Sequence, residues 1–240
     1  MTGTILNVVA VLIGGTIGLI FGSRIPDRFK NTVVASMGLF VAAMGLQMFF
    51  SSQNQLIVLG ALIIGVLLGE WWKIEDGLQA LGQTLEKRFS PKGEADSPAE
   101  NVSSSSTFVR GFMVASLLFC VGPMTILGSI QDGLTGDYQL LAVKSTLDLF
   151  ASIAFASTLG VGVLFSSLIV LVYQGGISLL AGSLSAIIND AMMNEMTATG
   201  GVILLGLALS DLLEIKKIRI GNFLPALAVA PLLVWIIEKF

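Results

Sequence analysis

Eight long apolar segments, almost free of charged residues, dominate this sequence of 240 residues. A helix needs about 20 apolar residues to cross a hydrocarbon core about 30 Å thick. Only helices and closed barrels satisfy the backbone hydrogen bonds inside a bilayer, and the alternating pattern of a barrel is missing here. The sequence therefore predicts an all-α membrane protein with about eight transmembrane helices. We place these spans at residues 4–22, 32–50, 56–72, 108–130, 140–160, 161–184, 197–213 and 222–237.

The composition agrees with a membrane protein and excludes several classes of chemistry. Only 12% of the residues are charged, against about 25% in soluble domains, and the mean hydropathy is +0.88. The chain has no histidine and one cysteine. This excludes a disulfide within the chain, the usual His/Cys metal sites and Ser-His or Cys-His catalysis. We therefore expect no enzyme activity, no metal and no cofactor, and nothing indicates a nucleic-acid partner.

The basic residues lie in alternate loops. Of the 13 lysines and arginines, all but Lys144 and Lys239 follow the first, third or seventh segment. By the positive-inside rule these loops are cytoplasmic, and both termini are extracytoplasmic. The alternation supports eight spans, although the charge-free turn near Gly160 leaves a count of six or seven open. We expect a multi-pass protein of the bacterial cytoplasmic (inner) membrane.

An internal repeat suggests that the chain consists of two related four-helix halves. Residues 60–75 align without gaps to residues 201–216, and the same offset carries Asn7 onto Asp148 (148 − 7 = 141). Four spans per half would give parallel repeats about an axis along the membrane normal. The expected organisation is residues 1–89 with the first three spans, a flexible cytoplasmic linker at 90–107, and residues 108–240 with the fourth span and the second half.

Residues 70–89 form a different kind of segment. Apolar side chains recur there at three- and four-residue steps, with acidic and basic side chains on the opposite face. This spacing predicts an amphipathic helix lying at the cytoplasmic interface, with Trp71 and Trp72 at headgroup level. A plain interfacial helix is favoured over a helix that binds a partner.

Lys144 and Asp148 are two opposite charges inside an apolar segment. Four residues apart, they share one helix face. Charges at this depth are costly and usually face a bundle interior, a partner or water. Two interpretations stay open: an ion pair that fixes the helix orientation, or a site that takes up a solute or ion. The expected lining of such a pathway is Asn7, Lys144, Ser145, Asp148, Gln174 and Asn222.

Glycine and proline mark two further features of the apolar segments. Gly122 and Pro123 lie within the predicted fourth span, where proline removes a backbone donor and frees the carbonyl near residue 119. A kink that serves packing is favoured there over a break that coordinates a ligand. Small residues at four-residue spacing on the first segment, at Gly14, Gly18 and Gly22, predict close helix packing.

Several motifs together resemble one known family. They are FCVGPMTILGSIQDGLTGD at 119–137, KSTLD at 144–148, TLGVGV at 158–163, YQG at 173–175 and IRIGNFLPALA at 218–228. The chain is similar along essentially its whole length to the bacterial inner-membrane family known as domain of unknown function 554 (DUF554). The resemblance implies a multi-pass membrane protein of a group often described as transporters, without an agreed substrate or inherited site residues. At Asp211, where an uncharged residue is expected, the chain departs from the family.

We therefore predict a secondary transporter or channel for a small solute or ion, with a pathway between the two halves. No Walker A sequence precedes a helix, so a gradient or another protein would drive it. The expected partners are the lipid bilayer and the solute, and the glycine seams are compatible with a homodimer. The alternative is a non-transporting scaffold or sensor that signals through the amphipathic helix and the linker. A membrane enzyme using carboxylate chemistry ranks third.

Overall fold

The computed structural model describes residues 1–22, 26–89 and 107–239, and within these ranges it is helical and contains no strand. The predicted linker lies outside the described residues, except that its last residue, Thr107, begins α5. The all-α fold is thus confirmed. The helices are α1 (Thr2–Gly22), α2 (Asp27–Phe49), α3 (Gln55–Trp72), α4 (Ile74–Phe89), α5 (Thr107–Cys120), α6 (Pro123–Thr135), α7 (Gln139–Leu159), α8 (Gly162–Leu179), α9 (Ala181–Ser185), α10 (Asp190–Leu207) and α11 (Ala226–Lys239).

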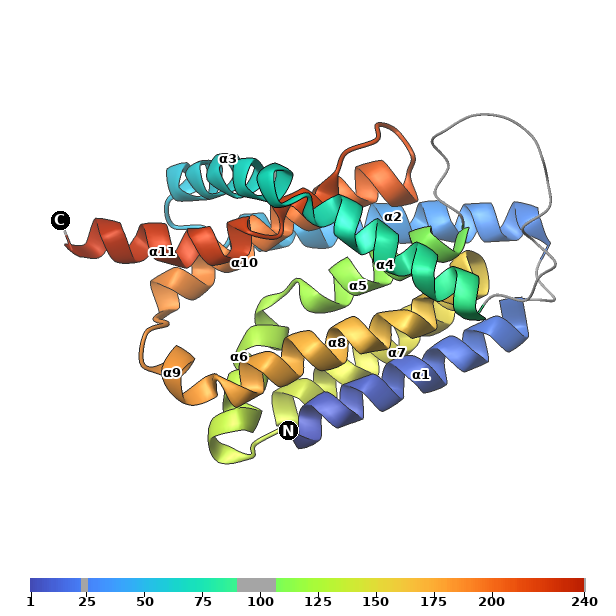
Figure 1. Ribbon diagram of the computed structural model, residues 1–240, viewed down its shortest axis with the longest axis horizontal. Helices are drawn as coiled ribbons and strands as arrows, with labels where there is room; N and C mark the ends of the chain where they lie inside the picture. Colours follow the sequence, from blue (N-terminus) through green and yellow to red (C-terminus); the bar gives the residue numbers. More distant parts are fainter. Residues whose placement is uncertain (23–25, 90–106, 240) are drawn as a thin grey trace.

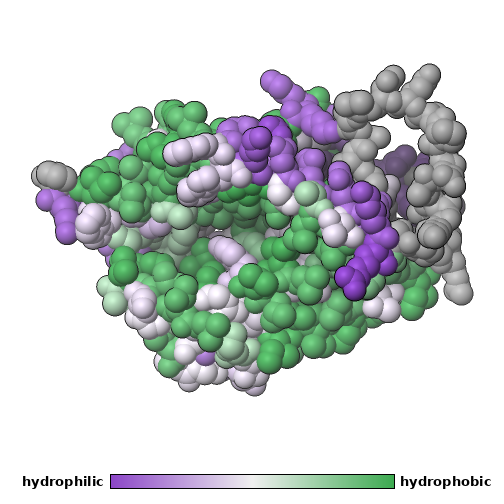
Figure 2. Space-filling view, viewed as in Figure 1, coloured by the Kyte–Doolittle hydropathy of each residue, from purple (hydrophilic) through white to green (hydrophobic). Residues whose placement is uncertain are grey.

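Seven of the described helical stretches are long and apolar enough to cross a membrane, and the bent pair α5 and α6 would be the eighth. This agrees with the prediction of about eight spans. Large apolar side chains cover much of the outer surface (Figure 2), among them Phe40, Leu56 and Val172. In water such a surface would aggregate, whereas in a bilayer it faces hydrocarbon of the same polarity.

The helices are arranged in two groups (Figure 1). One group contains α2, α3, α10 and α11, and the other contains α1, α6, α7 and α8. Helix α5 packs on α7 and α8 and also reaches α10, so it lies between the groups. Each group takes helices from both predicted halves of the chain. The relationship of those halves by an internal repeat stays a prediction, because it concerns sequence descent rather than spatial grouping.

The closest helix pair is α1 and α7, which run side by side in parallel. Glycines on α1 make this approach possible, because a Cβ atom at Gly14 or Gly18 would collide with the carbonyl oxygen of Leu149 or Ile153. Backbone-to-backbone packing of this kind is typical of small residues at four-residue spacing in membrane helices. The seam brings Asn7 of α1 to Asp148 of α7.

The last three predicted spans differ from the observed helices. The sixth ends early, at Leu179, and is followed by the short α9. The eighth is divided into a 3-10 turn at Ile220–Phe223 and α11, because Pro225 lies before its first turn. The seventh begins at Asp190 rather than at 197 and continues into a π turn at Ala208–Leu212.

Glu195 explains why the seventh span is longer than predicted. Its charge suggested a loop, yet the side chain is only 2% exposed and lies within α10. The carboxylate accepts hydrogen bonds from the backbone N–H groups of Gln53 (2.7 Å) and Asn54 (2.9 Å) and from the Ser52 hydroxyl (2.7 Å). Charge-assisted bonds of this kind offset the desolvation of a buried carboxylate. Glu195 therefore ties the α2–α3 loop to α10.

The amphipathic helix is present but shorter than predicted. Glu70, Trp71 and Trp72 belong to α3, and the chain turns at Lys73, whose φ of 53° ends that helix. The apolar face of α4 packs through Leu78 and Leu85 against a cluster on α5. Hydrophilic residues gather over α4 and its junction with α3 in Figure 2. The helix thus has a partner within the chain.

Arg219 forms exposed ion pairs at the same junction between α3 and α4. Arg219 contacts Asp76 and Glu70, the latter at 3.2 Å. The hydrogen bond and the charge of Asp76, with the nearby Glu70, raise the pKa of the Arg219 guanidinium above its usual value. Arg219 therefore remains charged under all ordinary conditions.

Candidate functional site: a buried polar cluster beside a broken helix

One face of α7 carries a row of polar side chains into the protein interior. Lys144, Asp148 and Ser152 follow one another at four-residue steps, Ser145 lies next to Lys144 and three residues before Asp148, and all four are buried. The rest of α7 exposes large apolar residues such as Phe150. This division is the expected pattern for a membrane helix whose polar face is covered by protein. The covering helix is α1.

Asp148 is the centre of the cluster. Its Oδ2 atom accepts a hydrogen bond from Nδ2 of Asn7 on α1 (2.9 Å) and also pairs with the Lys144 ammonium. Lys144 and Asp148 are 6% and 8% exposed, so both charges are largely removed from solvent. The Lys144 Nζ atom lies 5.9 Å from the centroid of the Phe119 ring on α5. Asn7 and Asp148, which the repeat offset pairs in the sequence, are thus in direct contact.

The fourth span is broken next to this cluster. Helix α5 ends at Cys120, α6 begins at Pro123, and the two axes differ by 63°. Between them Gly122 has a φ of 151°, which a residue with a Cβ atom rarely adopts. Because Phe119 lies near Lys144, the unwound turn is adjacent to the buried ion pair. Irregular backbone at membrane depth is tolerated only against protein or water.

Thr125 satisfies the carbonyl that the break releases. Its hydroxyl donates a hydrogen bond to the Phe119 carbonyl oxygen (3.2 Å), while Val121 N–H still bonds to Leu117 (2.9 Å). The released carbonyl was expected from the sequence, but the residue that bonds to it was not. Thr125 is fully buried, so its hydroxyl has no access to bulk water.

Replacing Thr125 by valine is expected to lower the free energy of unfolding by about 1–3 kcal/mol, because it leaves the Phe119 carbonyl unpaired at membrane depth. Thr146→Val is the matched control, since Thr146 is exposed on α7 and bonds only to its own helix. Unfolding by denaturant in detergent micelles measures both. Equal losses in the two variants would show that Thr125 does not support the break.

Several buried polar atoms around the cluster have no hydrogen-bond partner among the described residues. They belong to side chains on four different helices: Thr4 Oγ1, Asn7 Oδ1, Ser129 Oγ, Ser152 Oγ, and Gln174 Nε2 and Oε1. Leaving such an atom unpaired costs about 1–3 kcal/mol. Buried polar atoms in native proteins are almost always paired with protein or ordered water. This region is therefore suited to hold water or a polar solute.

Gln174 lies on α8, on the same side of the protein as the cluster. It is fully buried, and the next turn of α8 carries Ser178, whose hydroxyl donates to the Ser129 carbonyl on α6 (2.9 Å). The neighbouring Gly175 lies against the Met1 side chain at the start of α1. Gln174 thus belongs to the group of helices that encloses Asn7, Lys144, Ser145 and Asp148.

Asn222, which was also expected to line the pathway, bonds to groups other than those around Asp148. Its Oδ1 atom accepts a hydrogen bond from the Glu75 backbone N–H (2.8 Å), and Glu75 Oε2 accepts one from Gly221 N–H (2.6 Å). These contacts join the start of α4 to the 3-10 turn before α11. The sequence pattern could not separate this junction from the interior of a span, because the predicted eighth span began at Asn222 itself.

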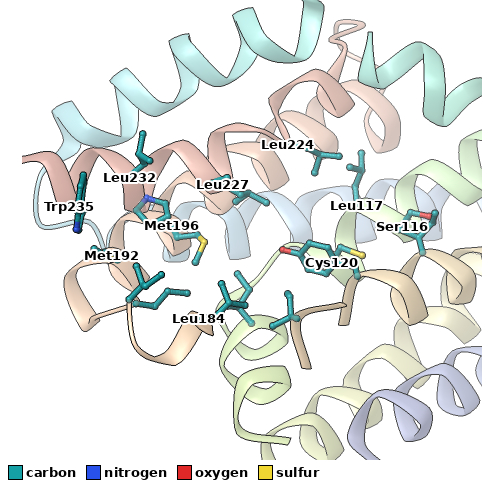
Figure 3. Close-up of a pocket in the computed structure, with 18 of the residues that line it drawn as sticks. Ser116, Leu117, Cys120, Leu184, Met192, Met196, Leu224, Leu227, Leu232 and Trp235 are labelled. Carbon is teal, nitrogen blue, oxygen red and sulfur yellow. The ribbon is translucent and has the colours of Figure 1, made fainter. Parts of the chain in front are cut away.

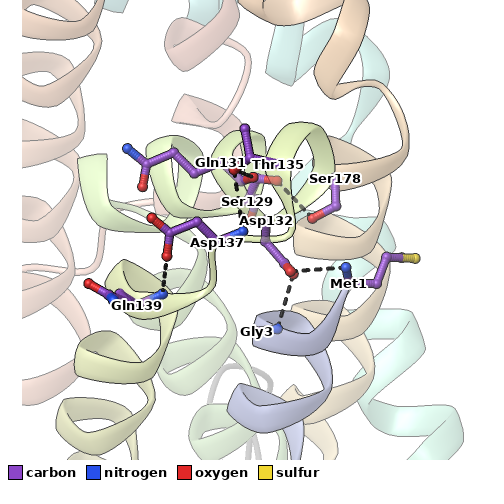
Figure 4. A network of polar contacts seen from close by, with 9 residues as sticks. All are labelled: Met1, Gly3, Ser129, Gln131, Asp132, Thr135, Asp137, Gln139 and Ser178. Atoms are coloured by element: carbon purple, nitrogen blue, oxygen red, sulfur yellow. Dashed lines mark hydrogen bonds and ion pairs between the residues drawn. The ribbon is translucent and has the colours of Figure 1, made fainter.

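A third polar site joins the start of α1 to α6 (Figure 4). Asp132 on α6 is 2% exposed and accepts hydrogen bonds from the Met1 amino group and the Gly3 N–H, both at 3.0 Å. The nearby Asp137 bonds through Oδ1 to the Gln139 N–H (3.0 Å) at the start of α7. Both aspartates lie between the predicted spans 108–130 and 140–160. For Asp137, a carboxylate just before a helix N-terminus was the available signal, whereas the groups that bond Asp132 lie far away in the sequence.

A bundle of long apolar helices, with its charges paired in the interior, defines a multi-pass α-helical membrane protein. The family described as "Protein of unknown function (DUF554)" matches residues 2–235, and the chain belongs to this family. It is 34% identical to the uncharacterized membrane protein YdfK of Bacillus subtilis, over all of this chain and 98% of the relative. It is 29% identical to the uncharacterized protein YqgA of Escherichia coli, over 95% of this chain and 94% of the relative. No solved structure matches the chain.

Proposed function

We propose that this protein is a secondary transporter or channel for a small solute or ion, with its pathway beside Lys144 and Asp148. The observation that carries this proposal is the buried network of Asn7, Asp148 and Lys144 at membrane depth, next to a broken helix. Ionisable residues in such positions favour a functional role, since they are costly to keep in a membrane. Unwound helices near the middle of a span are also common at the binding sites of transporters.

The chemistry of the cluster favours a small polar or ionic solute. Asp148 supplies negative charge, Lys144 supplies positive charge, and the amide groups of Asn7 and Gln174 can donate and accept. The unpaired oxygens of Thr4, Asn7, Ser129 and Ser152 add acceptors that a hydrated or hydroxyl-bearing solute could use. A cation or proton would compete with Lys144 for Asp148, which gives a direct way to couple binding to rearrangement of the pair.

The proposal includes the cellular setting. The protein lies in the bacterial cytoplasmic membrane with both termini outside, and its basic loops face the cytoplasm. It acts without a cofactor, a metal or an enzymatic step, and nucleic acid is not a partner. The glycine-rich helices leave a homodimer open as the working unit. A gradient supplies the driving force.

The alternative role, a scaffold or sensor, would use α4 as its output. Leu78 and Leu85 on the apolar face of this helix contact α5 within the same chain. A partner helix would first have to displace that contact. This observation favours the transport proposal over the alternative.

Asp148→Asn is expected to abolish solute flux in a protein that is less stable than wild type but still folded in detergent. Asp190→Asn is the matched control, because it makes the same chemical change at an exposed position at the start of α10. Proteoliposomes with internal pH- and sodium-sensitive dyes report proton and sodium flux. Metabolites that raise the melting temperature of the purified protein extend the panel. Flux that is unchanged in Asp148→Asn would remove Asp148 from the mechanism.

A further inference from the structure

An apolar groove of about 790 Å³ separates the two helix groups (Figure 3). Residues of α5, α8 and α9 form one wall, and residues of α10 and α11 form the other. Cys120, the last residue of α5, lines the floor beside the helix break, and Met196 and Leu227 line the opposite wall. The groove therefore lies where α5 is placed between the two helix groups.

The lining of the groove is hydrocarbon along almost its whole length. Ser116, Cys120, Tyr173 and Trp235 are the lining residues with a hydroxyl, thiol or ring N–H group. A water molecule in such a space would lack hydrogen-bond partners, since a buried water needs two to four of them. An apolar cavity of about 150 Å³ already binds benzene, and this groove is several times larger. An apolar ligand is the expected occupant.

The groove follows the direction of the membrane-crossing helices and is open at the side. In Figure 3, Ser116 on α5 lies at one end and Trp235, near the end of α11, at the other. Two rim residues, Leu232 and Ile187, are 55% and 61% exposed. In a bilayer this opening faces acyl chains, so a lipid reaches the groove by lateral diffusion.

The end at Trp235 carries one basic side chain, Lys239, next to Glu238, whose carboxylate accepts hydrogen bonds from Asn189 Nδ2 (3.2 and 3.0 Å). The Lys239 ammonium lies 4.0 Å from the centroid of the Trp235 ring, a cation–π contact that holds both groups at the mouth of the groove. Tryptophan is typical of the headgroup region, and a lysine beside it attracts an anionic phosphate. The mouth thus has the chemistry of a lipid headgroup contact.

We propose that the groove binds one phospholipid, with a hydrocarbon chain between the helix groups and the phosphate at Lys239. A second copy of this chain fits less well. A transmembrane helix about 10 Å wide and 30 Å long fills on the order of 2,500 Å³, far more than the groove. An extended acyl chain has the right shape and leaves the surrounding helices in place.

The test compares lipid retention by native mass spectrometry after purification in mild detergent. Wild-type protein is expected to carry one phospholipid, and Ala228→Trp is expected to reduce its occupancy at least tenfold. Ala228 is exposed and lines the groove, so the larger side chain fills it without removing a core contact. Val172→Trp is the matched control on the outer face of α8, where Val172 is 74% exposed outside the groove. Lys239→Gln is expected to lower phospholipid occupancy several-fold.

A second measurement does not depend on the folding of Ala228→Trp. In a Trp71→Phe, Trp72→Phe background, a phospholipid with brominated chains is added in detergent and quenches Trp235. Quenching that saturates near one lipid per protein supports the site, and quenching that rises without saturation overturns it. Equal lipid retention by Ala228→Trp and wild type also overturns it. The proposal is also overturned if the wild type is a dimer without bound lipid and Ala228→Trp is a monomer, because the groove would then be an interface between copies.

Discussion

Lys144→Met is expected to lower the free energy of unfolding by about 3–5 kcal/mol, because it leaves the Asp148 carboxylate buried without its cation. Asp148→Asn is expected to cost a similar amount by leaving Lys144 unpaired. In the double variant no uncompensated charge remains, so much of the stability should return. The two single variants and the double variant form a cycle whose coupling energy measures the pair. Unfolding by denaturant in detergent micelles provides the four stabilities.

The surface pair of Arg219 and Asp76 is the control for this cycle. Both side chains are about half exposed, and solvent screens their attraction. Arg219→Met should therefore change stability little. If Lys144→Met is equally harmless, water already reaches the pair, and the buried-charge argument fails. If the double variant is as unstable as the sum of the singles, Lys144 and Asp148 act independently.

Gly14→Ala is expected to destabilise the protein by about 1–3 kcal/mol, because the added methyl group overpacks the seam between α1 and α7. The new Cβ atom would collide with the Leu149 carbonyl oxygen, a backbone atom that cannot turn aside. Separation of the helices would also lengthen the hydrogen bond from Asn7 to Asp148. Loss of transport should therefore accompany the loss of stability, and melting curves with the flux assay measure both.

Gly176→Ala is the matched control for the seam. Gly176 lies in the membrane-crossing α8, and a Cβ atom there meets no atom within 4 Å. We expect unchanged or slightly improved stability, since alanine is the better helix former. If Gly14→Ala and Gly176→Ala behave alike, close backbone packing between α1 and α7 does not limit the fold.

The membrane fold was predictable because long apolar segments leave few alternatives. The interior face of α7 was predictable from the four-residue spacing of Lys144 and Asp148, and the repeat offset pointed to Asn7 as a neighbour. Direct contact between Asn7 and Asp148 required the structure, because an alignment does not say which helices touch. The division of the helices into two groups could not be predicted, since every apolar segment presents similar surfaces to its neighbours.

The errors concern polar residues at the ends of spans. Glu195 and Asp132 lie outside the predicted spans, because a carboxylate beside an apolar segment usually contacts water. In the structure both side chains are buried, and each accepts hydrogen bonds from backbone N–H groups of another element. Those donors lie far away in the sequence. The partner of Asn222 is distant in the sequence as well, because Glu75 belongs to the α3–α4 junction.

The glycine seam has a mechanical consequence. Close backbone contacts at Gly14, Gly18 and Gly22, together with the hydrogen bond from Asn7 to Asp148, oppose sliding of α1 along α7, so we expect the two helices to move as one unit. The groove leaves space between the two helix groups, so fewer side chains are in contact there. The turn at Gly122 interrupts the helical hydrogen bonding between α5 and α6. If the protein is the transporter proposed above, alternating exposure of the ion pair to the two sides of the membrane would consist of α1 and α7 tilting together against α10 and α11, with Gly122 as the pivot.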